Sequence, residues 1–139
     1  MNYDNNNIFA KIIRKDLPSE VVYEDQDTLV IMDIMPKADG HILVIPKSAC
    51  RNILDANQEQ LKSCICIVQK MAKVVKEAFN ADGVTVQQFN ESAGGQEVFH
   101  LHFHVLPRMD DLNLRKHDGK MQDHSVLKAN AEKIRAILK

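Results

Sequence analysis

The chain of 139 residues has no tryptophan, only 3 cysteines and no apolar run of the roughly 20 residues that span a bilayer. An odd number of cysteines without a paired framework argues against a disulfide scaffold. We therefore interpret Cys50, Cys64 and Cys66 as small core residues rather than metal ligands. The polar segment 1–7 has no signal-peptide pattern. These absences predict a cytoplasmic protein that is not inserted in a membrane.

Neither sign of charge predominates in this chain. The 18 basic and 19 acidic residues give a formal net charge of −1, so the basic footprint of a nucleic-acid-binding protein is missing. A small nucleotide is still compatible with this balance, because it needs only a local phosphate site. The length predicts one domain over residues 1–139 with a sizeable buried core.

The apolar periodicity predicts one long helix among several short strands. Apolar residues recur at three- and four-residue spacing from Leu61 to Phe79, with Asn57 as the expected N-cap and Asp82-Gly83 as the expected end. In a first short helix over 8–14, Ile8, Phe9 and Ile12 are expected to face inward. A final short helix is expected over 125–138 after a polar, irregular segment, and strands over 21–24, 28–33, 41–45, 84–89 and 99–107.

The order of these segments predicts the fold class. Most connections between the expected strands are short, which favours antiparallel pairing. The regular alternation of strand and helix that marks a doubly wound fold is missing. We therefore predict an α+β fold.

Three of the 6 histidines, His100, His102 and His104, alternate with apolar residues in the last expected strand. Successive strand side chains point to opposite faces, so the three imidazoles should share one face while Leu101 and Phe103 enter the core. Three interpretations compete. The face could be an exposed polar edge, a zinc site completed by His41 or a carboxylate, or a centre for nucleophilic and acid–base chemistry on a phosphate.

The loop that precedes the histidines favours the phosphate. The segment Ser92-Ala93-Gly94-Gly95-Gln96 is small and glycine-rich. Such a loop exposes backbone N–H groups and lets an anion approach closely. Placed just before three aligned histidines, it indicates an oxyanion-type site beside a nucleophile.

The segment His100-Leu101-His102-Phe103-His104-Val105-Leu106 resembles the motif of the histidine-triad (HIT) superfamily, His-x-His-x-His followed by two apolar residues. Asn90, Gly95-Gln96 and Val98 also match the family, as do segments near residues 8–14 and 33–47, so the resemblance spans about 8–108. It implies a HIT-like five-stranded antiparallel sheet with one long helix and a short C-terminal helix. It also implies a homodimer in which two sheets join.

The resemblance, closest to the nucleoside phosphoramidase branch, implies a purine nucleotide-binding hydrolase. Its partner would be AMP or GMP and their derivatives, and it would need neither a cofactor nor a metal. It would cleave nucleoside phosphoramidates at the α-phosphate through a nucleotidyl-histidine intermediate. Two alternatives stay open: a dinucleoside polyphosphate hydrolase, and a nucleotide-binding regulatory dimer with little turnover.

The resemblance also implies roles for individual residues. His102 would be the nucleophile, His100 and His104 would orient it and hydrogen-bond the phosphate, and His41 would lie near the same site. The expected phosphate-binding residues are Asn90, Gly95, Gln96, Glu97 and Val98, and the expected nucleoside-binding residues are Asp33, which would bind the ribose, and Ile8, Phe9, Ile12, Ile31 and Ile34 around the base.

Three positions depart from the family pattern. Glu97 stands where relatives often have Ser or Thr near the leaving group, and we expect its carboxylate to favour a cationic amine over an anionic polyphosphate. Asn7 and Ala10 stand where some bacterial relatives have a zinc-binding cysteine pair, so that structural site should be missing. Ile31 stands where some relatives have an aromatic residue, which leaves the choice between adenine and guanine open.

Overall fold

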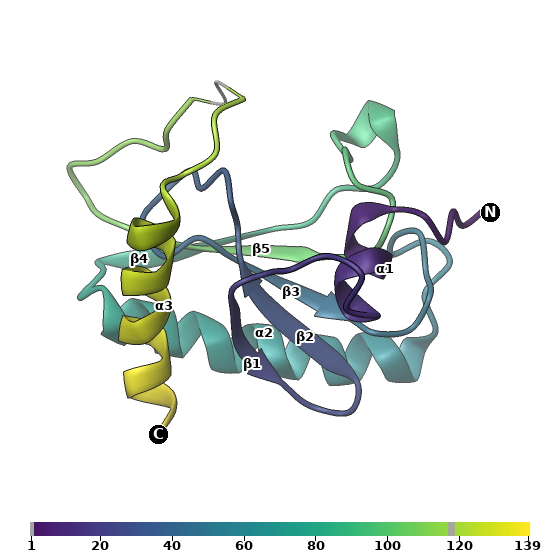
Figure 1. Cartoon of the computed structure of the whole chain (residues 1–139), viewed down its shortest axis with the longest axis horizontal. Coiled ribbons are helices and arrows are strands. Elements are labelled where there is room, and N and C mark those ends of the chain that lie inside the picture. The colour runs from purple at the N-terminus through teal and green to yellow at the C-terminus, as the bar shows by residue number, and fades with distance from the viewer. Residues whose placement is uncertain (1, 117–118) are drawn as a thin grey trace.

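The computed structural model describes residues 2–116 and 119–139. Five strands form one antiparallel sheet in the order β1-β2-β3-β5-β4 (Figure 1). The strands are β1 (Val21–Glu24), β2 (Thr28–Met32), β3 (Ile42–Pro46), β4 (Gly83–Gln87) and β5 (Phe103–Arg108); the helices are α1 (Ile8–Ile13), α2 (Gln58–Ala78), α3 (His124–Leu138) and the short 3₁₀ turn η1 (Ser92–Gly94). The predicted α+β class with a five-stranded antiparallel sheet is confirmed.

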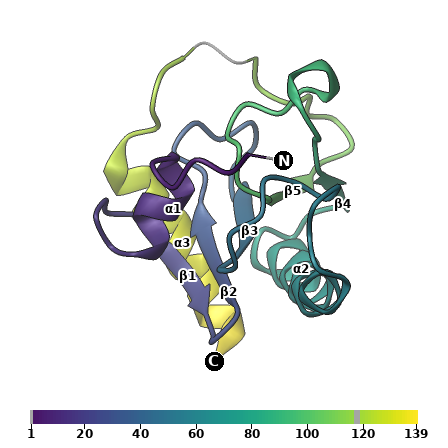
Figure 2. The same cartoon turned by 90° about the vertical axis from the view of Figure 1, so that its right-hand side faces the viewer.

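Both faces of the sheet are covered, which explains why every residue of β2 and β3 is buried. The residues Val30, Met32, Ile42 and Val44 pack with α2 and α3 on one face. Their strand neighbours Leu29, Ile31, Leu43 and Ile45 pack with Phe9 and Ile12 of α1 on the other. Figure 2 shows β2 and β3 lying between α1 and α2. A short helix covers less of a face than a long one does, so the α1 face has room for a cleft.

The predicted beginning of the long helix α2 is correct, but its predicted end is not. The Asn57 side chain accepts hydrogen bonds from the N–H groups of Glu59 and Gln60, which confirms the predicted N-cap. The predicted end at Asp82-Gly83 is wrong: α2 ends at Ala78, and Asn80 takes a left-handed conformation with φ of 48°. Asparagine tolerates that conformation, so it ends the helix early and leaves Gly83 to begin β4.

Two expectations about burial need correction. Phe9 and Ile12 of α1 are buried, but Ile8 is 43% exposed, because the buried stripe of this six-residue helix follows Phe9 and Ile12. Cys50 and Cys64 are buried as expected, whereas Cys66 is exposed on α2. Residues two apart on a helix do not share a face.

The histidine segment is less regular than the sequence predicts. The strand expected over 99–107 starts only at Phe103, so of the three histidines only His104 lies in β5. The backbone N–H of Leu101 instead donates to the Cys50 carbonyl, outside the sheet. The alternation persists through this irregular stretch, because Leu101 and Phe103 still enter the core beneath α2.

The segment from Met109 to Asp123 contains no helix or strand in its described part, as expected. It returns across the β2–β3 loop, where the Arg115 N–H donates to the Lys37 carbonyl at 2.8 Å and the Gln122 N–H to the Ile34 carbonyl at 2.7 Å. Over the described ranges, no helix has both the length and the apolar character needed to cross a membrane.

Candidate active site

A cleft of about 580 Å³ opens on the α1 face of the sheet. Its walls come from α1, from β2 and the loop after it, from β3, and from the segment between β4 and β5. Most of the residues predicted from the sequence lie around it: His41, His102, His104, Gly95, Glu97, Val98, Ile8, Phe9, Ile12, Ile31, Asp33 and Ile34. Residues from distant parts of the chain therefore converge on one site.

His102 lies at the centre of the histidine group. Its Nδ1 is 2.6 Å from the carbonyl oxygen of His100. A carbonyl can only accept, so Nδ1 carries the proton and donates, and Nε2 keeps its lone pair in the neutral ring. The ring packs edge-on against Phe9 and against His104, with centroids 4.8 and 5.0 Å apart respectively. This histidine, on the cleft wall, is thus held in a tautomer suited to nucleophilic attack.

His100 does not line the cleft; it is buried behind His102. Its Nε2 donates to the carbonyl of Pro46 at 2.7 Å, which leaves Nδ1 as an acceptor. The hydroxyl of Tyr3 donates to that Nδ1 at 2.5 Å. His100 therefore supports the site through its backbone carbonyl, which fixes His102, rather than through its ring.

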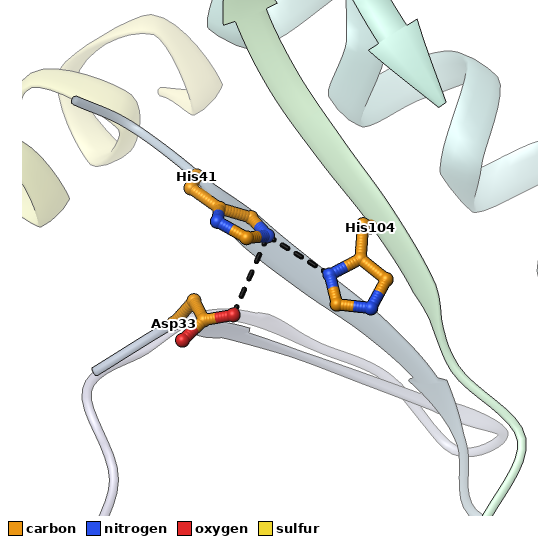
Figure 3. Close-up of side chains that lie close together, drawn as sticks. All are labelled: Asp33, His41 and His104. Atoms are coloured by element: carbon orange, nitrogen blue, oxygen red, sulfur yellow. Dashed lines mark hydrogen bonds and ion pairs between the residues drawn. The ribbon is translucent and has the colours of Figure 1, made fainter. Parts of the chain in front are cut away.

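His41 and His104 form a second pair at the wall beside Asp33 (Figure 3). The backbone N–H of Lys37 donates to His41 Nδ1 at 3.0 Å, so the ring proton of neutral His41 is on Nε2. That Nε2 lies 2.9 Å from His104 Nδ1 and 3.4 Å from an Asp33 carboxylate oxygen. His104 accepts at Nδ1, and its proton is therefore on Nε2.

Burial holds all four imidazoles in the neutral form. Desolvation is the largest cause in each case, and it lowers the pKa of His100 to about 4 and those of His41 and His104 to about 3. The pKa of His102 is also lowered by burial, although its bond to the His100 carbonyl opposes the shift. At neutral pH the group is uncharged, in agreement with the proton positions that the hydrogen bonds require.

Asp33, His41 and His104 could also hold a metal ion, since one ligand atom from each lies within 4.8 Å of the others. An ion there would need the lone pair of His41 Nε2. That atom carries a proton as long as the Lys37 N–H donates to Nδ1. Metal binding would therefore have to break this bond as well as the one between the two histidines.

The loop before the histidines is more closed than the sequence suggests. The N–H groups of Gly94, Gly95 and Gln96 all donate within the loop, to Glu91 and Ser92 carbonyls, so they are not the free donors that we expected. A loop this short satisfies its own donors by turning into the 3₁₀ helix η1. The cleft is lined instead by Gly95, Glu97 and Val98.

Two predicted phosphate-binding side chains point elsewhere. Gln96 is 4% exposed, and its amide bonds to Arg51, Asn52, Glu91 and Val98. Asn90 accepts from the Ile53 N–H and exchanges hydrogen bonds with the Gln88 side chain. Neither residue lines the cleft. Both side chains instead stabilise the conformation of the loop.

Several residues of the site are not predicted from the sequence. Phe89 packs edge-on against His104 with centroids 5.6 Å apart, and Lys37 lines the cleft near Met35. Leu43 was expected only as a strand residue, yet its alternate position places it on the cleft wall. The period-two pattern of β3 could have found Leu43; nothing in the local sequence marks Lys37 or the segment around Asn52.

The sheet and the three histidines beside a cleft define a protein of the histidine-triad class. The model of the HIT domain matches residues 14–111, and the chain therefore belongs to the HIT domain family. "Protein hit" of Bacillus subtilis is 40% identical over 103 residues, which are 74% of this chain and 71% of that protein.

Two further relatives bear on function and fold. The purine nucleoside phosphoramidase of Escherichia coli is 36% identical over 100 residues, 71% of this chain and 84% of that protein. A Hit-like protein from Bartonella henselae has a structure that superposes with a TM-score of 0.92 at 56% identity, covering 98% of this chain and 99% of the other. The family and these names support a HIT family hydrolase and confirm the HIT-like fold.

Proposed function

We propose that this protein is a purine nucleotide-binding hydrolase that cleaves nucleoside phosphoramidates at the α-phosphate. One observation carries the proposal: His102 donates through Nδ1 to the His100 carbonyl, which leaves Nε2 unprotonated on a residue of the cleft wall. The name of the Escherichia coli relative supports the substrate class.

The reaction proceeds by two displacements at phosphorus. The Nε2 lone pair of His102 forms a bond to the α-phosphorus while the bond to the amine nitrogen breaks. The amine leaves with that electron pair and takes up a proton. Water then attacks the phosphorus and loses a proton, and the bond to Nε2 breaks and returns its electron pair to the ring. The fixed ring brings the reacting atoms into line, which replaces a costly encounter in solution.

The other wall of the cleft suits a nucleoside. Phe9, Ile12 and Ile31 offer an apolar surface for the base, with Ile8 and Ile34 at the more exposed edge. Asp33 lies between this surface and the histidines, where its carboxylate could accept from ribose hydroxyls. One of its oxygens also accepts from the Met35 N–H at 2.8 Å, which orients the carboxylate.

Two charged residues of the cleft bear on the identity of the leaving group. Glu97 lines the cleft, and its negative charge favours departure of a cationic amine. Lys37 lines the same cleft and carries the opposite charge. The positive charge of Lys37 suits an anionic polyphosphate and so favours the second candidate, a dinucleoside polyphosphate hydrolase.

We further propose that the protein is a cytoplasmic homodimer. The edge of the sheet supports the homodimer. Strand β4 is the outermost strand beside β5, and its Val86 is 46% exposed. An exposed edge with an apolar side chain is suited to pairing with a second copy. Sedimentation of the purified protein at micromolar concentration would separate a dimer from a monomer.

The function is tested by hydrolysis of adenosine and guanosine phosphoramidates, with a diadenosine polyphosphate in parallel. His102→Ala is the critical variant. We expect phosphoramidate turnover that the variant loses. Turnover that survives in the variant would contradict the role of His102. Preference for the polyphosphate would favour the second candidate, and binding without any turnover would favour a regulatory dimer.

A further inference from the structure

A short segment after β3 runs beside the loop and the irregular histidine stretch. We call residues 50–53 the clamp, because each of them bonds to the segment 90–101. The Cys50 carbonyl accepts from Leu101 and the Arg51 carbonyl from the Gln96 side chain, at 3.0 and 2.7 Å. The Ile53 N–H donates to Asn90 at 2.9 Å. The clamp thus supplies hydrogen-bond partners to this stretch, as a neighbouring strand does for β5.

Asn52 is the buried centre of the clamp. The residue is 0% exposed, and its Nδ2 donates to Gln96 Oε1 at 3.0 Å and to Glu91 Oε2 at 2.5 Å. Its Oδ1 accepts from the Leu54 N–H. A buried amide with its donors and acceptor satisfied in one geometry fixes the position of its partners.

Gln96 is fixed by the same contacts. Its Nε2 donates to the carbonyls of Arg51 and Val98, and its Oε1 accepts from Asn52 and from the Glu91 N–H. The amide has no hydrogen-bonding capacity left for a ligand. Gln96 can therefore act on the cleft only through its neighbours Gly95, Glu97 and Val98, which line it.

Glu91 shows that the loop depends on this support. Its φ of 63° and ψ of 164° lie in a region that is almost confined to glycine, so a glutamate adopts this conformation at a cost. The carboxylate is held by Arg51, through Nε at 2.8 Å and Nη2 at 3.0 Å, and by Asn52. Arg51 also lies over the Phe99 ring at 4.2 Å, next to His100. The clamp therefore holds both ends of the loop.

We propose that Asn52 is a positioning residue for phosphate recognition: by locking Gln96 and Glu91 it sets where the cleft-lining residues Gly95, Glu97 and Val98 meet the phosphate of a bound nucleotide. This inference rests on the proposed function. The proposed nucleoside wall belongs to α1, β2 and the loop after β2, and these contacts of Asn52 do not include it. Loss of Asn52 should therefore weaken recognition of the phosphate and spare that of the nucleoside.

The test compares binding of AMP and adenosine, with GMP and guanosine in parallel, to Asn52→Ala. We expect the dissociation constant of the nucleotide to rise about tenfold while that of the nucleoside stays within about twofold. Asn57→Ala is the matched control, because it also removes an asparagine that satisfies backbone or side-chain partners, but at the α2 N-cap. The control should lower the melting temperature and leave both affinities near the wild-type values.

Gln96→Glu provides an isosteric second variant if Asn52→Ala does not fold. It places a carboxylate oxygen against the Arg51 and Val98 carbonyls and should give the same selective loss of nucleotide affinity. Equal losses for nucleotide and nucleoside, or no loss for either, would overturn the inference, while phosphoramidate turnover by the wild type would still uphold the proposed function. Wild-type protein that binds no nucleotide or nucleoside would overturn both.

Discussion

The ring nitrogens His41 Nε2 and His104 Nδ1 lie 2.9 Å apart, and the direction of the proton between them is set from outside the pair. The Lys37 N–H occupies His41 Nδ1, so His41 must donate and His104 must accept. His104 therefore keeps its proton on Nε2, and its ring packs against that of His102, the proposed nucleophile. A backbone donor in the β2–β3 loop thus determines which proton is available in the cleft.

This order of protons predicts different outcomes for two substitutions of His41. His41→Phe removes the donor to His104 and should lower kcat roughly tenfold, because His104 can then take either tautomer. His41→Gln keeps an amide donor near the position of Nε2 and should retain most of the activity. Steady-state kinetics and ¹⁵N shifts of His104 check both results. Equal losses in the two variants would show that the hydrogen bond to His104 is unimportant.

The neutral histidines predict that stability falls in mild acid. His41, His100 and His104 have folded pKa values of about 3, 4 and 3, below the ordinary value of 6.5. Between these limits the unfolded chain binds more protons than the folded one, so stability rises with pH and is fully present only above about 6.5. Each such histidine should lower the free energy of unfolding by on the order of 1–2 kcal/mol as the pH falls from 7 to 5.

Urea denaturation at several pH values measures this dependence. The free energy of unfolding should change less steeply with pH in His41→Gln, because this variant lacks one of the titrating groups. A free energy of unfolding that is the same at pH 7 and 5 would mean that the imidazoles protonate freely in the folded protein.

Local patterns predicted most of the fold, because they are set by residues close in sequence. The alternation in β2 and β3, the helical period after Leu61 and the Asn57 cap all act within a few residues. The predicted end of α2 was wrong because Asn80 tolerates a left-handed turn, as glycine does. The predicted start of β5 was wrong because the Leu101 N–H donates to the Cys50 carbonyl of the clamp instead of to a neighbouring strand.

The candidate site was less predictable where it depends on contacts between distant segments. The motif pointed to His102, but the Tyr3 hydroxyl on His100 joins residues 97 positions apart. The side chains of Gln96 and Asn90 turn away from the cleft because distant partners in the clamp compete for them. No pattern within the loop itself reports those partners.

Two adjacent glycines should respond differently to alanine. Gly95 has φ of +95°, and an added Cβ would lie 3.2 Å from the Phe89 ring, whereas nothing lies within 4 Å of a Cβ at Gly94. Gly95→Ala should cost roughly 1–2 kcal/mol of stability and lower activity, since the left-handed backbone disfavours a side chain. Gly94→Ala should stay close to wild type. Thermal melting and kcat/KM measure both; similar behaviour of the two variants would contradict this geometry.

The charge of Glu97 should govern the choice of leaving group. Glu97→Gln, of nearly the same size, should lower kcat/KM for an amine leaving group relative to a polyphosphate by roughly tenfold. Glu97→Ser should shift the ratio in the same direction. The two substrates are compared in competition at neutral pH. An unchanged ratio in both variants would show that the carboxylate does not act on the leaving group.

In the proposed reaction, His102 Nε2 forms a covalent bond to the α-phosphorus of the substrate. Rapid quenching of a phosphoramidate reaction, followed by peptide mapping under conditions that preserve phosphorus–nitrogen bonds, tests it most directly. We predict a nucleotidyl group on the peptide that contains His102, transient during turnover and missing in His102→Ala. Turnover by the wild type with no adduct at any time point, or with the adduct on another histidine, would show that His102 is not the nucleophile.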